Sequence, residues 1–182
     1  MIDLDAPGRP GDWSGGCYQL VIACSWSHDE LASALGALAA LPELEGYWRG
    51  RGAEALAAAP LPLDASLLCA AGELVGKLRI EGDGVTLVAL RVRAGAGDRA
   101  TALVLSLPLG SLDRAVPGGL ADYPFGETLR FESLDESTPA VPSSLRWREP
   151  LDRLLAGLAE AVAAVVPVRD VRIGYEIDDG GS

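Results

Sequence analysis

A single histidine limits the acid–base chemistry that this chain can perform. His28 lies between Ser27 and Asp29, and Cys24 and Ser25 precede it. A serine or cysteine nucleophile needs a histidine within hydrogen-bonding reach and a third group that orients the ring. Side chains adjacent in sequence do not generally meet in this way, and the pattern around His28 is typical of a helix start. We therefore expect His28 to be a solvent-facing residue of a first helical turn.

Carboxylates are the most numerous candidate ligands, and several gather in residues 110–146, a segment without regular patterning. Hard cations such as Ca²⁺ and Mg²⁺ prefer oxygen ligands, but no EF-hand spacing is present. Two carboxylates from distant segments could serve a hydrolase without leaving a linear signature. The pattern favours a solvated acidic loop, and we expect neither a metal site nor a cofactor. The acidic residues of interest are Glu127, Glu132, Asp135 and Glu136.

Two glycine-containing stretches match nucleotide-binding motifs only in part. Residues 72–78, GELVGKL, are one residue short of a phosphate loop and place Leu78 where a magnesium-binding hydroxyl is required. Residues 95–100, GAGDRA, match the letters of the dinucleotide fingerprint, but their glycines lie between two predicted strands. We interpret both stretches as turns that lead into strands.

The cysteines indicate a reducing environment. Cys17, Cys24 and Cys69 have no CxxC spacing. The first two are seven residues apart in one predicted strand, roughly 23 Å at about 3.3 Å per residue, which is too far for a disulfide. We expect all three to be reduced and mostly buried, as in a cytoplasmic protein.

Hydrophobic patterning predicts the element order β-α-β-β-β-α-β. Strand 17–26 is apolar on both faces, which is typical of a central strand. A helix follows, because Ser27 and Glu30 have the spacing of a capping box. A second helix begins at Pro150 and has an apolar stripe at helical spacing. The predicted strands after the first are 76–80, 85–93, 101–109 and 170–178, and the stripe is Leu151, Leu154, Leu155, Leu158, Val162 and Val165.

This order predicts the α+β class: about five mostly antiparallel strands with two main helices on one face. The length of 182 residues favours a single domain. We expect that domain to span 17–178 and to contain the long irregular loop 110–146. A loosely ordered arm at 1–16 and a tail at 179–182 complete the chain.

The charge balance excludes some partners. Lys and Arg number 15 and Asp and Glu number 26, which gives a net charge of −11. This balance argues against nucleic-acid binding, which rests on basic charge. No apolar run approaches the ~20 residues of a membrane helix, and the first residues lack a signal pattern. We expect a cytoplasmic protein that contacts neither nucleic acid nor membrane.

Three stretches resemble a known class of protein when taken together. They are 107–112 (LPLGSL), 123–125 (YPF) and the Leu/Val-rich helix that runs into 173–176 (IGYE). This layout resembles small bacterial α+β proteins found as immunity proteins in polymorphic toxin systems. The resemblance implies a protein that neutralises a toxin by covering its surface. It implies no catalytic residue, because such families share no catalytic signature.

We therefore predict a non-catalytic, acidic protein-binding protein whose partner is a basic toxin. Aromatic and arginine residues in irregular segments are typical of interface anchors, although packing beneath a loop is the commoner role of such a tryptophan. An enzyme with dispersed carboxylates and arginines (Arg130, Arg146 and Arg148) and an assembly subunit remain alternatives, and the oligomeric state stays open. The expected contact residues are Trp48, Tyr123, Glu127, Glu132, Asp135, Glu136, Trp147 and Glu176.

Overall fold

The computed structural model describes residues 15–49, 63–80, 84–116, 118–120, 129–132 and 150–177, with the backbone alone described at 46–49 and 129–132. The strands are β1 (Cys17–Trp26), β2 (Leu44–Arg49), β3 (Glu73–Arg79), β4 (Val85–Ala94), β5 (Ala100–Pro108), β6 (Leu129–Glu132) and β7 (Asp170–Tyr175). The helices are α1 (His28–Ala39), α3 (Ala65–Ala71), α4 (Leu109–Ala115) and α5 (Pro150–Ala163), with a short 3₁₀ turn η2 (Ala96–Asp98).

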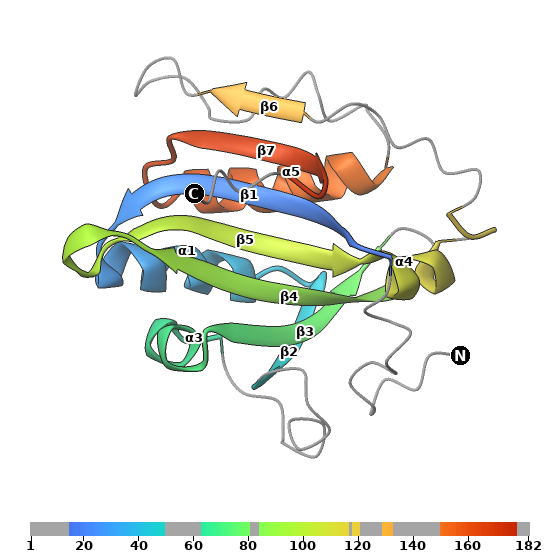
Figure 1. Ribbon diagram of the computed structural model, residues 1–182, viewed down its shortest axis with the longest axis horizontal. Helices are drawn as coiled ribbons and strands as arrows, with labels where there is room; N and C mark the ends of the chain where they lie inside the picture. The colour runs from blue at the N-terminus through green and yellow to red at the C-terminus, as the bar shows by residue number, and fades with distance from the viewer. Residues whose placement is uncertain are drawn as a thin grey trace.

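The described strands form one sheet in the order β2-β3-β4-β5-β1-β7-β6, and all of the pairings in it are antiparallel. Helices α1 and α5 pack against each other and cover one face of this sheet (Figure 1). The predicted α+β class, with its antiparallel sheet and two main helices on one face, is confirmed. Within the described ranges, no helix is long and apolar enough to cross a membrane.

Strand β1 supplies the centre of the core, as its two apolar faces predicted. It pairs with β5 on one side and with β7 on the other. Its alternate residues from Tyr18 to Trp26 are buried in the cluster that also contains the apolar residues of α1 and α5. Trp26 has no exposed surface, and its indole Nε1 donates a hydrogen bond to the Pro167 carbonyl at 2.6 Å.

The predicted capping box begins α1. Glu30 N donates to Ser27 Oγ at 3.3 Å, and Ser27 N donates to Glu30 Oε2 at 2.7 Å. The hydrogen bond from the Ser27 backbone lowers the pKa of Glu30, because it stabilises the carboxylate. The residues that α1 buries are Leu31, Ala34, Leu35 and Leu38.

Helix α5 begins at Pro150, as expected, and buries most of the predicted stripe. Two expectations at this end of the chain are wrong. Val165 lies beyond the helix end and is exposed. Strand β7 stops at Tyr175, because Glu176 takes the left-handed φ of 36° and ends the alternation. Tyr175 is therefore half exposed, whereas Ile177 is buried on the sheet face opposite α5.

The structure adds elements where irregular chain was expected. Strand β2 forms one sheet edge and β6 the other. Helix α4 and strand β6 both lie in the segment 110–146 that the sequence analysis assigned to one irregular loop. The meander β3-β4-β5 is confirmed, and both glycine-containing stretches are turns: Gly72 precedes β3 with φ 76°, and Gly97 lies between β4 and β5. Residues 1–14 of the predicted arm 1–16, and the tail at 179–182, lie outside the described residues.

A buried hydrogen bond joins the central strand to the helix layer, and it can be tested with one matched pair of variants. Tyr18 Oη donates to Asp152 Oδ1 on the first turn of α5, and both residues are almost fully buried. We expect Tyr18→Phe to lower the free energy of unfolding by about 1–3 kcal/mol, because the buried carboxylate loses a donor.

Tyr175→Phe is the control, since Tyr175 Oη donates to the Gly15 carbonyl in an exposed position. It should change the free energy of unfolding by less than about 0.5 kcal/mol. Urea unfolding followed by circular dichroism measures both values. Equal decreases in the free energy of unfolding for the two variants would show that the buried hydrogen bond stabilises the fold no more than the exposed one.

Candidate functional site

The sheet face opposite α1 and α5 carries a mixture of small apolar and charged side chains. Because side chains alternate along a strand, the residues between the core positions of β1, β4, β5 and β7 point to this face. Val21, Ala102, Val104 and Ile177 form a buried cluster there, separate from the main core. Ile177 joins it because the chain turns at Glu176.

Three arginines surround this cluster. The sheet register places Arg91 opposite Val104, Val104 opposite Val21, and Val21 opposite Arg172. Arg93 follows in the neighbouring row, opposite Ala102. Three strand steps of about 4.8 Å separate Arg91 from Arg172, and the residues that lie between them in this row, Val104 and Val21, are small. We call the surface formed by Arg91, Arg93, Arg172, Val21, Ala102 and Val104 the arginine face.

Acidic side chains at the border of the arginine face engage its cations only in part. Arg91 forms an ion pair with Glu73 of the adjacent strand β3. Asp170 Oδ2 lies 3.6 Å from Arg172 Nε, beyond hydrogen-bonding distance, and this buried Nε–H finds no acceptor among the described residues. Among the described side chains, Arg172 therefore keeps a buried donor without an acceptor.

The cations of the arginine face also act on one another. Burial lowers the pKa of Arg93, and the charge of Arg172 lowers it further. The second effect has this sign because a neighbouring positive charge disfavours the protonated guanidinium. An anion placed between the two side chains would relieve this repulsion.

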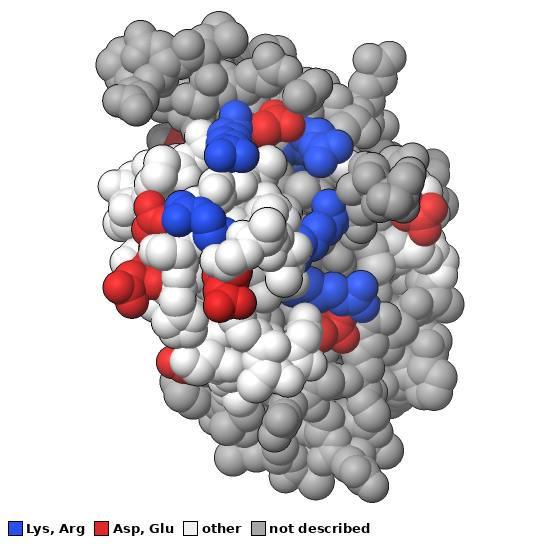
Figure 2. Space-filling model, turned by 60° about the vertical axis from the view of Figure 1, so that its left-hand side comes forward, with Lys and Arg blue, Asp and Glu red and all other residues white. Residues whose placement is uncertain are grey.

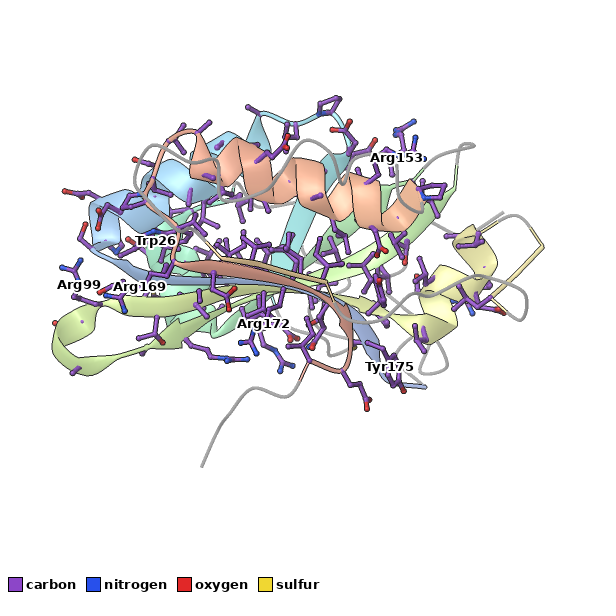
Figure 3. All side chains as sticks on the ribbon, turned by 90° about the horizontal axis from the view of Figure 1, so that it is seen from above. Trp26, Arg99, Arg153, Arg169, Arg172 and Tyr175 are labelled. Carbon is purple, nitrogen blue, oxygen red and sulfur yellow. The ribbon has the colours of Figure 1, made fainter. Side chains whose placement is uncertain are left out.

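The figures show where this charge lies. In Figure 3, Arg172 points away from the helix layer on the opposite side of the sheet. Figure 2 shows basic side chains along a band of the molecular surface, separated by uncharged surface and flanked by acidic side chains. More than half of the net charge of −11 comes from residues outside those with described side chains. The arginine face is thus a locally basic region in an acidic chain.

Most of the contact residues predicted from the sequence cannot be placed on this surface. Trp48 lies in β2 opposite Val75, and Glu132 lies in β6 opposite Asp170, with their backbones alone described. The structure does not bring these two positions together, since β2 and β6 are opposite edges of the sheet. Five predicted residues lie outside the described ranges: Tyr123, Glu127, Asp135, Glu136 and Trp147.

Glu176 is the predicted contact residue whose side chain is described. It is exposed directly after β7, beside the half-exposed Tyr175. A Cβ on Gly16 would collide with the Tyr175 hydroxyl and the Glu176 carboxylate, so glycine at this position allows their close approach. In the sheet register Tyr175 lies opposite Tyr18 and shares the core-side alternation of Val171 and Ile173, so it does not belong to the face that carries Arg172.

His28 is exposed at the start of α1, as expected, but its partner is none of the residues considered from the sequence. Its Nε2 lies 3.2 Å from Ser66 Oγ of α3. A cavity of about 300 Å³ adjoins this pair, with Cys69 and Arg99 in its wall. The contact has the reach of a nucleophile and its base, but within the described residues no group orients the histidine ring, as acyl transfer requires. The described side chains also include no group of three or more His, Cys, Asp and Glu that could hold a metal ion.

The arginine face was not predicted from the sequence, because its residues come from four strands, β1, β4, β5 and β7. Arg91 and Arg93 lie in β4 and Arg172 in β7, so no linear motif unites them. Alternation within each strand does contain a signal: each arginine lies between two apolar residues, as is typical of a strand with one polar face.

Comparisons with known proteins found no match, so the functional proposal rests on the geometry described above. No family model, no curated protein and no solved structure matches the chain.

The three thiols differ in environment, which predicts their reactivity. None of the three forms a disulfide, as expected, but Cys69 is exposed, whereas the cysteines were expected to be mostly buried. Burial raises the pKa of Cys24 to about 11, so only about one thiol in a thousand ionises at pH 8. Because the thiolate is the nucleophile, iodoacetamide should alkylate Cys69 first and leave Cys24 intact at pH 8.

Mass spectrometry of timed samples checks this order, and full alkylation in denaturant is the control. Alkylation of Cys24 should begin only as the pH approaches 11. Equal rates for Cys24 and Cys69 at pH 8 would contradict the buried position of Cys24 in β1.

Proposed function

We propose that this chain is a non-catalytic protein-binding protein and that its partner docks a carboxylate-bearing segment on the arginine face. The position of Arg91, Arg93 and Arg172 on one sheet face, around small apolar side chains, carries this proposal. Arginine recognises carboxylates through paired N–H donors in fixed geometry, and the buried Arg172 Nε–H is one such donor.

The composition of the surface favours a protein over a nucleic acid. Glu73 and Asp170 lie among the arginines and would repel a phosphate backbone. The net charge of −11 opposes the extended phosphate contacts on which nucleic-acid affinity rests. Arginine is instead enriched in protein interfaces, where it pairs with carboxylates of the partner.

The resemblance to immunity proteins suggests the biological form of this binding. We extend the proposal to a toxin that the chain neutralises by covering its surface. A toxin that is basic overall is attracted by the net negative charge of the chain, and an acidic contact segment on that toxin can bind the arginine face. The net negative charge of the chain would accelerate association, and the arginine face would fix the bound orientation.

Two single substitutions test the proposal, and each changes the net charge of the chain by the same amount. Arg172→Gln removes a cation from the arginine face, and Arg114→Gln removes one from α4. Affinity capture with wild-type protein and mass spectrometry would name the partner, and calorimetry with the purified partner would follow. We expect Arg172→Gln to raise Kd at least about tenfold, because a charge-assisted hydrogen bond is lost, and Arg114→Gln to leave Kd within about twofold.

Other outcomes would count against the proposal. Equal Kd values for the two variants would remove the arginine face from the interface. A stable homo-oligomer that binds no other protein would favour an assembly subunit. Metal-dependent turnover that is lost on substitution of Glu127 or Glu132 would favour the enzyme with dispersed carboxylates.

A further inference from the structure

The turn that ends β7 brings two exposed polar side chains together beside the start of β1. Glu176 has a left-handed φ of 36°, and its backbone N–H donates to the Cys17 carbonyl at 3.0 Å. This conformation is uncommon for glutamate, and strained residues of this kind are concentrated at functional sites. In Figure 3, Tyr175 lies at the end of the sheet opposite to the end that carries Arg99.

Two glycines hold these side chains in place. Gly15 and Gly16 have φ values of 83° and 82°. The Gly15 carbonyl accepts a hydrogen bond from Tyr175 Oη at 3.1 Å, and the Gly16 carbonyl accepts one from Leu109 N at 3.0 Å. A Cβ on Gly16 would collide with both the Tyr175 hydroxyl and the Glu176 carboxylate, so these two groups are close neighbours. The glycine backbone therefore fixes their arrangement before any partner binds.

The carboxylate of Glu176 is exposed and has no hydrogen bond or ion pair with the side chains that the structure describes. Glu45 and Glu73 differ in this respect, because each pairs with an arginine of the neighbouring strand. Half of the Tyr175 surface is also exposed. The turn therefore presents a negative charge and an aromatic ring side by side. We call these two side chains the Tyr175–Glu176 subsite.

An arginine side chain fits both parts of this subsite. Its planar guanidinium donates paired hydrogen bonds to a carboxylate and stacks on the face of an aromatic ring. A lysine ammonium can approach the carboxylate, but it has no plane with which to stack. It is also more strongly hydrated than a guanidinium, so its contact with a half-exposed site is weaker.

We propose that the Tyr175–Glu176 subsite binds an arginine side chain of the protein partner. This inference rests on the proposed protein-binding function and adds a second contact of opposite sign. The arginine face takes a carboxylate from the partner, and the Tyr175–Glu176 subsite takes a cation from it. Two contacts of opposite charge at separate places specify one bound orientation, because a rotated partner would bring like charges together.

Three small probes test the subsite without the partner. They are the Nα-acetyl amides of arginine, citrulline and lysine, and citrulline has nearly the shape of arginine without its charge. Titration of the isotope-labelled full chain at low salt, followed by proton–nitrogen correlation NMR, reports the site of binding. We expect the arginine probe to bind with a millimolar Kd and to shift the amides of Gly15, Gly16 and Glu176. Citrulline and lysine should have a Kd at least about fivefold higher.

Substitutions separate the charge from the ring. Glu176→Gln should raise the Kd of the arginine probe at least about fivefold, because the carboxylate is lost. Glu43→Gln is the matched control, since it removes the same charge in the connection between α1 and β2, and it should leave the Kd within about twofold. Tyr175→Leu should raise the Kd, whereas Tyr175→Phe should retain it because the ring remains.

Three results would overturn the subsite: equal Kd values for arginine and citrulline, equal Kd values for Glu176→Gln and Glu43→Gln, or shifts spread over the whole acidic surface. None of these results bears on the arginine face. Conversely, equal partner affinity of Arg172→Gln and Arg114→Gln would overturn the proposed function and leave the probe measurements unchanged. With the purified partner, Glu176→Gln should raise Kd at least about fivefold. An unchanged Kd beside a weakened Arg172→Gln variant would remove the subsite from the interface.

Discussion

The fold depends on the position of strand β1, which has neighbours on both edges and on both faces. Its backbone pairs with β5 and β7, one set of its side chains forms the middle of the core, and the other set includes Val21 beneath the arginines. The hydrogen bond from Tyr18 to Asp152 joins this strand to α5 across the core. A shift of one residue in the pairing register of β1 would turn its core side chains toward the arginine face and Val21 toward the core. Both the core and the arginine face would be disrupted.

Local signals made much of the architecture predictable. The Ser27–Glu30 capping box, Pro150 and the apolar stripe of α5 act within a few residues, and the structure contains each of them. Strand β2 escaped prediction because its pairing register shifts between Glu45 and Tyr47, which interrupts the alternation that marks a strand. The end of β7 at Glu176 was equally hidden, since glutamate has no preference for the left-handed conformation that it adopts there.

The candidate site was less predictable than the fold, and the reason is geometric. Acidic residues were predicted as contact residues because they dominate the net charge and several of them lie close together along the chain. Arg91 and Arg172 become neighbours across the sheet only through the register of four strands. The same limit applies to His28 and Ser66, which are 38 residues apart and meet because α1 and α3 pack together.

The central position of β1 also affects how the chain can acquire its structure during synthesis. Strand β1 leaves the ribosome before either of its two partners, β5 and β7, and the residues of the Tyr18–Asp152 pair are 134 positions apart. A topology dominated by such distant contacts folds slowly, because loop closure precedes the gain from pairing. Until β7 arrives, one edge of an apolar strand is available to other chains. Aggregation during expression would therefore reflect delayed completion of the sheet, and co-translational chaperones would act mainly before the last strand emerges.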